Sequence, residues 1–291
     1  MYLSLDPTVV WNCFWIVWVG VVYRGRTVPI AWRVVAQASS RVRLWTIQRV
    51  LRQTARVLPE GVVVVLLADQ GFADGKLMKY LRENLRWHFR IRIKRSFQFQ
   101  LHAQWHKVSS VQLQQGQAYF TVMVSIGKTN PYPNVYLAFA HDQLSDQNWV
   151  IVSDEPTTLQ TFAQYRLSFQ VEESFLDLKS NRFNLEASRL RNKFALSQLC
   201  GVIALTMLFL VLQGTQVVAS GQRRLVDTHW NRGMSYLKLG WNWIRLAITK
   251  QWKIHLLLFL LTRHLTHNLQ SLLNDNVTSL FSANSPSCLA F

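Results

Sequence analysis

The sequence predicts an α/β fold, and three observations lead to this prediction. Strand-like apolar runs and amphipathic helical patterns succeed one another over residues 2–93. The uninterrupted aliphatic run at residues 62–68 is typical of a central strand that is buried on both faces. Short alternating segments between residues 95 and 153, separated by glycines and prolines, indicate an antiparallel β insertion. Strands followed by alternating helices and strands favour the α/β class.

The individual elements follow from the periodicity. We expect strands at 2–8, 14–23, 27–34, 62–68 and 87–93, and helices at 40–58 and 76–84. In the first helix, Ile47, Val50 and Leu51 give an apolar side, and arginines lie largely on the remainder. After the insertion, Thr157 or Thr158 is expected to cap a new helix. The segment 165–179 has no Gly or Pro and is expected to be helical.

Three acids stand out because the chain has only 15 Asp and Glu against 32 Lys and Arg. Asp6 ends a short apolar run, and Asp69 directly follows the aliphatic run. Acids at the ends of buried strands lie where α/β sheets usually bind ligands. Glu172 falls on the same predicted helical stripe as Tyr165 and Phe175, so we expect it to face inward. A buried carboxylate must be paired, protonated or bound to a metal.

Three carboxylates without a supporting Cys or His suit Mg²⁺ or Mn²⁺ better than Zn²⁺. Each acid also has a purely structural interpretation. Asp69 could cap the following turn, and Glu172 could pair with Lys179. The ordered set of three favours a metal site over these separate explanations.

The ordered acids also resemble a known family, the DDE transposases of bacterial insertion sequences, whose catalytic domain is ribonuclease-H-like. The insertion-sequence type-four group carries a helix signature of Tyr, Arg, Glu and Lys, which corresponds here to Tyr165, Ser168, Glu172 and Lys179. Segments 22–32 and 67–72 are similar to the family as well. The resemblance implies a catalytic domain over residues 1–218, including the β insertion at 95–153, and a basic, Trp-rich helical region over 219–291.

The resemblance implies metal-dependent cleavage of DNA at transposon ends, followed by strand transfer. Asp6, Asp69 and Glu172 would be the catalytic residues and would hold Mg²⁺ or Mn²⁺, as two ions. Tyr165 and Lys179 would contact DNA. The partner would be DNA, as transposon end and target, with a possible homodimer on DNA, no membrane and no nucleotide cofactor. The protein would act in the bacterial cytoplasm, associated with the nucleoid.

Two departures from the family pattern bear on activity. Ser168 replaces an arginine, the side chain best suited to gripping phosphate through two hydrogen bonds. Family members carry a DNA-end-binding region before the first Asp, which here is residue 6, so we expect an N-terminally truncated domain. The alternatives are an active transposase and a non-catalytic remnant that still binds DNA.

Charge and hydropathy leave a third alternative, a basic protein associated with a membrane. A net charge of +17 and a pI near 10.4 imply a polyanionic partner, either nucleic acid or an anionic membrane surface. The apolar stretches 9–23 and 199–212 are shorter than the roughly 20 residues that span a bilayer. We expect the first to form strand, turn and strand, and the second to form a core helix. A basic membrane-associated protein is therefore the least favoured interpretation.

The C-terminal part of the chain interleaves basic residues with tryptophans, among them Trp230, Trp241, Trp243 and Trp252. This pattern suits phosphate contacts with base stacking, or equally a helical cap whose tryptophans fill a core. The histidines at 255–267 do not form a convincing metal site. Cys13, Cys200 and Cys288 are far apart and indicate neither a disulfide framework nor a metal site.

Overall fold

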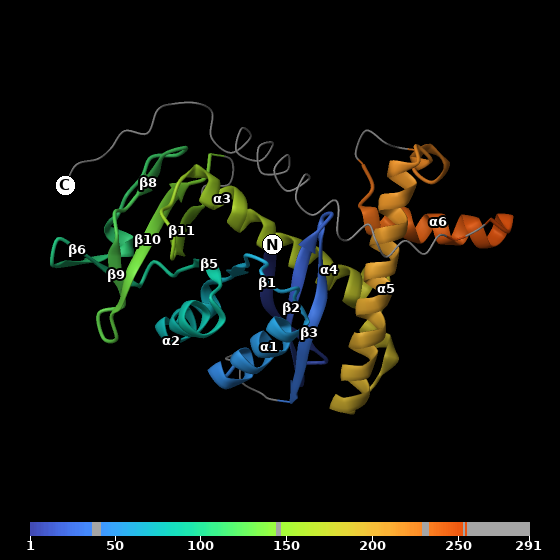
Figure 1. The fold of residues 1–291 in the computed structure, drawn as a ribbon, viewed down its shortest axis with the longest axis horizontal. Coiled ribbons are helices and arrows are strands. Elements are labelled where there is room, and N and C mark those ends of the chain that lie inside the picture. Colours follow the sequence, from blue (N-terminus) through green and yellow to red (C-terminus); the bar gives the residue numbers. More distant parts are fainter. Residues whose placement is uncertain (37–41, 144–146, 229–232, 253, 255–291) are drawn as a thin grey trace. The chain divides into compact units, whose positions relative to one another are not determined.

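The structure is a computed structural model that describes residues 1–36, 42–143, 147–228, 233–252 and 254. Figure 1 labels its helices and strands, which fall into two compact units. Unit 1 comprises Met1–Asp6 and Ser39–Phe169, and unit 2 comprises Pro7–Ala38 and Gln170–His267. This division differs from the predicted domains, 1–218 and 219–291, which stay a prediction.

Unit 1 is built on a mixed sheet. Its parallel part pairs β1 (Tyr2–Val10, of which residues 2–6 belong to this unit) with β4 (Val65–Ala68), and β4 with β5 (His88–Arg92). Helix α1 (Leu44–Val57) lies between β1 and β4 in sequence, and α2 (Gly75–Lys79) lies between β4 and β5. These are the predicted strands and helices, with boundaries shifted by a few residues.

The predicted antiparallel insertion is confirmed. It contains β6 (Gln98–Leu101), β7 (Gln104–Lys107), β8 (Ala118–Phe120), β9 (Val124–Ile126), β10 (Tyr132–His141) and β11 (Asn148–Ser153). Strand β11 pairs antiparallel with both β10 and β5, and so joins the insertion to the parallel strands. Helix α3 (Leu159–Arg166) follows, capped by Thr158 as expected, and packs Phe162 and Tyr165 against β10 and β11.

Unit 2 contains a long hairpin of β2 (Phe14–Tyr23) and β3 (Arg26–Ala36), as predicted. Three helices pack with it: α4 (Gln170–Leu176), α5 (Lys193–Ala219) and α6 (Tyr236–Lys250). Their core includes Trp18, Phe175 and Cys200. Burial raises the pKa of the Cys200 thiol to about 12, so this thiol stays protonated and unreactive. The parallel strands, the hairpin and the helices make an α/β fold consistent with a ribonuclease-H-like core.

Helix α5 is longer than the apolar stretch at 199–212 suggested. Helix α5 has 27 residues. By length and composition alone, it is the one helix in the described part of the chain that could cross a membrane, although 44% of its most apolar window is buried. The buried side includes Leu196, Ile203 and Met207 in the core of unit 2, and Trp32 of β3 donates a hydrogen bond to the Ser197 carbonyl at 3.0 Å. These contacts are those of the predicted core helix.

Helices α5 and α6 cross at Gly214 and Gly240. A methyl group on Gly214 would collide with the Tyr236 carbonyl, and one on Gly240 with the Leu210 carbonyl. The two backbones touch because neither glycine has a side chain. Of the tryptophans in the C-terminal region, Trp243 is buried and Trp241 packs on the core, so both fill space. Trp230, the histidines at 255–267 and Cys288 lie outside the described residues.

Candidate metal and DNA site

Two of the three predicted catalytic acids lie side by side in unit 1. The parallel register pairs Leu5 with Ala68, so the next residues, Asp6 and Asp69, are level on adjacent strands. Residues that are level on neighbouring strands point to the same face of a sheet. Asp6 and Asp69 are therefore placed at neighbouring positions where β4 ends.

The contacts of the Asp69 side chain do not explain this acid as a residue that stabilises the fold. Asp69 is exposed and precedes the short 3₁₀ turn Gln70–Phe72, but its carboxylate accepts no capping hydrogen bond. Within the described residues, Asp69 makes no ion pair. Its carboxylate accepts one hydrogen bond, from the Tyr165 hydroxyl at 3.4 Å. The capping interpretation of Asp69 is therefore wrong.

Tyr165 reaches Asp69 from the core. Only 1% of Tyr165 is exposed, and its ring meets Trp149 and Phe169 edge to face, with centroids 5.9 and 6.1 Å apart. Burial, and then the nearby charge of Asp69, raise the pKa of the Tyr165 hydroxyl far above its usual value. The phenol therefore keeps its proton and donates a hydrogen bond to Asp69. This geometry suits holding Asp69 in place better than the predicted contact with DNA.

Glu172 is exposed, so the prediction that it faces inward is wrong. The segment 165–179 is not one regular helix, because a 3₁₀ turn at Leu167–Phe169 separates α3 from α4 and a π turn follows at Asp177–Asn181. Three residues at 3.0 per turn instead of 3.6 rotate the following positions by about 60°. Within the described residues, no ion pair or hydrogen bond involves the Glu172 carboxylate, so the predicted structural pairing with Lys179 is not formed.

The buried acid of this segment is Asp177, which the sequence analysis did not single out. Its side chain is 2% exposed and accepts a hydrogen bond from Arg26 Nε at 2.6 Å. Nearby, the Thr27 amide donates to Ser174 Oγ at 2.8 Å. These hydrogen bonds join segment 22–32 to residues 174–177 within unit 2. The sequence signal that could have identified Asp177 is its position between Leu176 and Leu178 in a chain with few acids.

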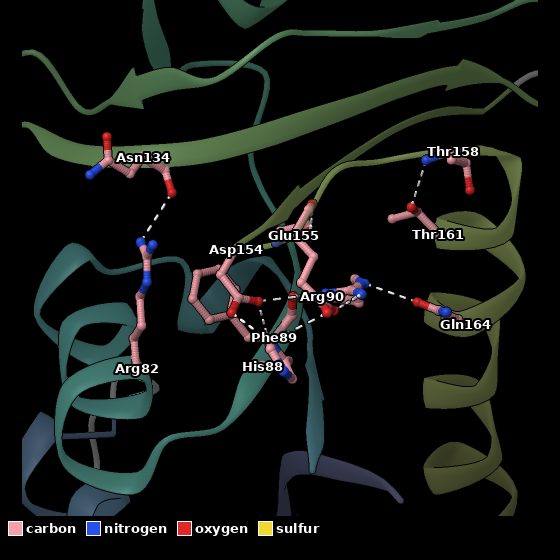
Figure 2. A network of polar contacts seen from close by, with 11 residues as sticks. Arg82, His88, Phe89, Arg90, Asn134, Asp154, Glu155, Thr158, Thr161 and Gln164 are labelled. Carbon is pink, nitrogen blue, oxygen red and sulfur yellow. Dashed lines mark hydrogen bonds and ion pairs between the residues drawn. The ribbon is translucent and has the colours of Figure 1, made fainter. Parts of the chain in front are cut away.

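A second cluster of titratable side chains lies at the start of β5. His88 Nδ1 is 2.8 Å from Asp154 Oδ2 and 3.6 Å from Glu155 Oε1, and such a group could hold a metal ion, since its ligand atoms lie within 4.8 Å of one another. Figure 2 shows Arg90 beside these acids. Arg90 lies 2.6 Å from Glu155, while Asp154 also accepts from the Phe89 amide at 3.0 Å. The cluster is already balanced by protein donors.

The remaining residues of the helix signature differ in exposure. Ser168 is 7% exposed, in the 3₁₀ turn, whereas Lys179 is half-buried in the π turn. Position 168 therefore does not provide the arginine of the family signature, whereas Lys179 stands at the position of its lysine.

A fold with paired acids at the ends of parallel strands belongs to the class of α/β proteins that bind ligands at this edge. The family model described as transposase DDE domain matches residues 19–209. The chain therefore belongs to the transposase DDE domain family. The matched range contains Asp69, Tyr165, Glu172 and Lys179 but not Asp6.

Comparison with curated proteins gives no match. Among solved structures, the chain is similar to one described as the cryo-EM structure of piggyBac transposase synaptic complex with hairpin DNA, at 11% sequence identity and a TM-score of 0.46. The similarity covers 98% of this chain and 58% of that chain. The present sequence thus spans less than two thirds of that transposase chain.

Proposed function

We propose that this chain is a metal-dependent transposase of the insertion-sequence type-four group, which cleaves DNA at transposon ends and transfers the freed strand to target DNA. The observation that carries the proposal is the position of the acids, together with the structural contacts that Asp69 and Glu172 lack within the described residues. Asp6 and Asp69 lie level on adjacent parallel strands, and neither Asp69 nor Glu172 makes the contact that would give it a structural role. The family match supports the same reaction class.

The donor set fits Mg²⁺ or Mn²⁺, because carboxylate oxygens are hard ligands and the ion pairs of the described residues leave Asp69 and Glu172 uncompensated. Asp6, Asp69 and Glu172 would hold two ions. Such ions would supply activation of the attacking oxygen and stabilisation of the leaving oxygen in phosphodiester chemistry. Tyr165 would fix the orientation of Asp69, and Lys179 would contact a DNA phosphate.

The proposed partners are the transposon end and the target DNA, bound by a homodimer in the bacterial cytoplasm at the nucleoid. The net charge of +17 supports a polyanionic partner. Neither a nucleotide cofactor nor a membrane is part of the proposal.

A second candidate function is favoured by Ser168. This residue is 7% exposed and cannot replace the arginine of the family signature as a phosphate contact. A chain without this contact could bind DNA while cleaving it poorly, as a non-catalytic remnant.

A nicking and strand-transfer assay separates the two functions. Supercoiled plasmid and short duplex DNA are incubated with the full chain in Mg²⁺, Mn²⁺ or EDTA. We expect metal-dependent cleavage that is lost in Asp69→Ala and Glu172→Ala and retained in Glu173→Ala. Glu173 is the matched control because it is an exposed acid on the same helix, whose contact is an ion pair with Arg26 at 3.7 Å. DNA binding without cleavage by the unmodified chain would instead establish the remnant.

A further inference from the structure

Helix α1 carries a row of arginines on its solvent side. Arg49, Arg52 and Arg56 are separated by three and four residues, so they lie along one face, and all three are exposed. Trp45, one turn before Arg49, extends the row and is 50% exposed. We call Trp45, Arg49, Arg52 and Arg56 the α1 basic face. Together with Gln48 and Gln53, these side chains line an open surface pocket of about 440 Å³.

The three arginines lack acidic partners within the described residues, where no ion pair involves them. Helix α1 itself contains no Asp or Glu. By contrast, two arginines with largely buried side chains are paired with acids, Arg26 with Asp177 and Arg90 with Glu155. Like charges three and four residues apart destabilise a helix by a few tenths of a kcal/mol per pair. The row therefore costs stability, and an external anion would relieve its repulsion.

The chemistry and spacing of the α1 basic face fit a phosphate backbone. A guanidinium binds phosphate through two parallel hydrogen bonds. Arg49 and Arg56 are seven residues apart, which is about 10 Å along a helix. Each strand of duplex DNA carries one charge per roughly 3.4 Å of its axis, so about three phosphates match the row. An anionic membrane fits less well, because Ile47, Val50 and Leu51 of the apolar face are buried and unavailable for insertion.

We propose that the α1 basic face binds the phosphate backbone of duplex DNA, as a contact separate from the catalytic carboxylates. This inference goes beyond the proposed reaction and does not depend on metal-dependent cleavage. It assigns to α1 a sequence-independent contact that holds the duplex, and it predicts a strong dependence of this contact on salt.

The test uses the full chain carrying Asp69→Ala, in EDTA, so that cleavage does not enter. Binding to a labelled 30-base-pair duplex is measured by fluorescence anisotropy over a series of KCl concentrations, because the affinity of proteins for DNA phosphates depends on salt. The test variant adds Arg49→Gln, Arg52→Gln and Arg56→Gln. The matched control adds Lys76→Gln, Arg86→Gln and Arg95→Gln, which remove three exposed charges from the same unit.

The test variant should bind roughly tenfold or more weakly, and the slope of log affinity against log salt should fall by about 2–3, because each lost phosphate contact removes roughly 0.9. The control should bind nearly as well as the parent, and circular dichroism should show an unchanged helix content in both. Equal losses in test and control variants would overturn the proposal. So would a variant that keeps its duplex affinity and loses only binding to phosphatidylglycerol vesicles. Neither result depends on whether the unmodified chain cleaves DNA.

Discussion

The two acidic clusters of unit 1 lie at opposite edges of the parallel strands, one where β4 ends and the other where β5 begins, and they differ in how their charge is balanced. At the end of β4, Asp69 lies level with Asp6, is exposed, and accepts a single hydrogen bond from a neutral phenol. At the start of β5, Asp154 and Glu155 are paired with His88 and Arg90.

This difference is the basis on which we propose the first cluster as the metal site and interpret the second as a structural network. Buried charges are tolerated when protein donors satisfy them, and the donors around Asp154 do so. An acid that folding leaves uncompensated is available to an external cation. Proximity of ligand-type residues alone would have selected the His88 cluster, whereas the balance of charge selects Asp69.

The largest expected effect is on activity at the first cluster. Replacing Asp69 by Asn keeps the size of the side chain but removes the charge, and we expect metal-dependent nicking to fall by ~10²–10³-fold or more, the order seen when one transition-state-stabilising group is lost. The melting temperature should change little, because Asp69 is exposed and makes no ion pair within the described residues. A time course of plasmid nicking measures the activity, and a thermal melt measures the melting temperature. A large loss of stability would mean that Asp69 is structural.

The second cluster should show the opposite response. Arg90→Met leaves Asp154 and Glu155 without their guanidinium partner. We expect a loss of up to about 3 kcal/mol, the low end for breaking a buried pair, because the Glu155 side chain is 41% exposed and Asp154 keeps the Phe89 amide as a donor. Urea denaturation followed by circular dichroism measures the free energy of unfolding. An Arg90→Met protein as stable as the parent would show that the network does not hold β5 to β11.

His88→Ala tests whether the second cluster is a metal site. We expect the Mn²⁺ concentration that gives half-maximal nicking to stay unchanged, and the free energy of unfolding to fall by roughly 1.5–3 kcal/mol through loss of a hydrogen bond to a charged group. Isothermal titration with Mn²⁺ and Zn²⁺ is the direct measurement. Loss of a bound equivalent of metal in the variant would make the cluster a true metal centre.

The smallest expected effect comes from Tyr165→Phe, which removes only the hydroxyl that contacts Asp69 at 3.4 Å. We expect a loss of about 0.5–1.5 kcal/mol in the interaction that orients Asp69. This should raise the Mg²⁺ concentration required for nicking several-fold while leaving DNA affinity in EDTA unchanged. A loss of DNA affinity with an unchanged metal requirement would instead restore the predicted DNA contact of Tyr165.

Sequence patterns were sufficient where one physical rule dominated. The aliphatic run before Asp69 and the short run before Asp6 predicted buried central strands, and the observed parallel register places both acids level. Thr158 could be predicted as a cap because a hydroxyl at this position satisfies free backbone amides.

The sequence was insufficient where long-range contacts decide. The exposure of Glu172 depends on a 3₁₀ turn at Leu167–Phe169 that no residue type in that segment signals. The burial of Asp177 depends on Arg26, which lies 151 residues away in the sequence. Periodicity assumes a regular helix, and this helix changes its pitch twice.

The crossing of α5 and α6 has a consequence for protein production. Because the backbones touch at Gly214 and Gly240, α6 covers Leu210 of α5, while Leu237 of α6 is fully buried in return. An expression boundary placed at residue 218, where the catalytic domain was predicted to end, would uncover that surface, and exposed apolar patches favour aggregation. A shortened protein intended for crystallisation or binding assays should therefore retain the chain through Trp252.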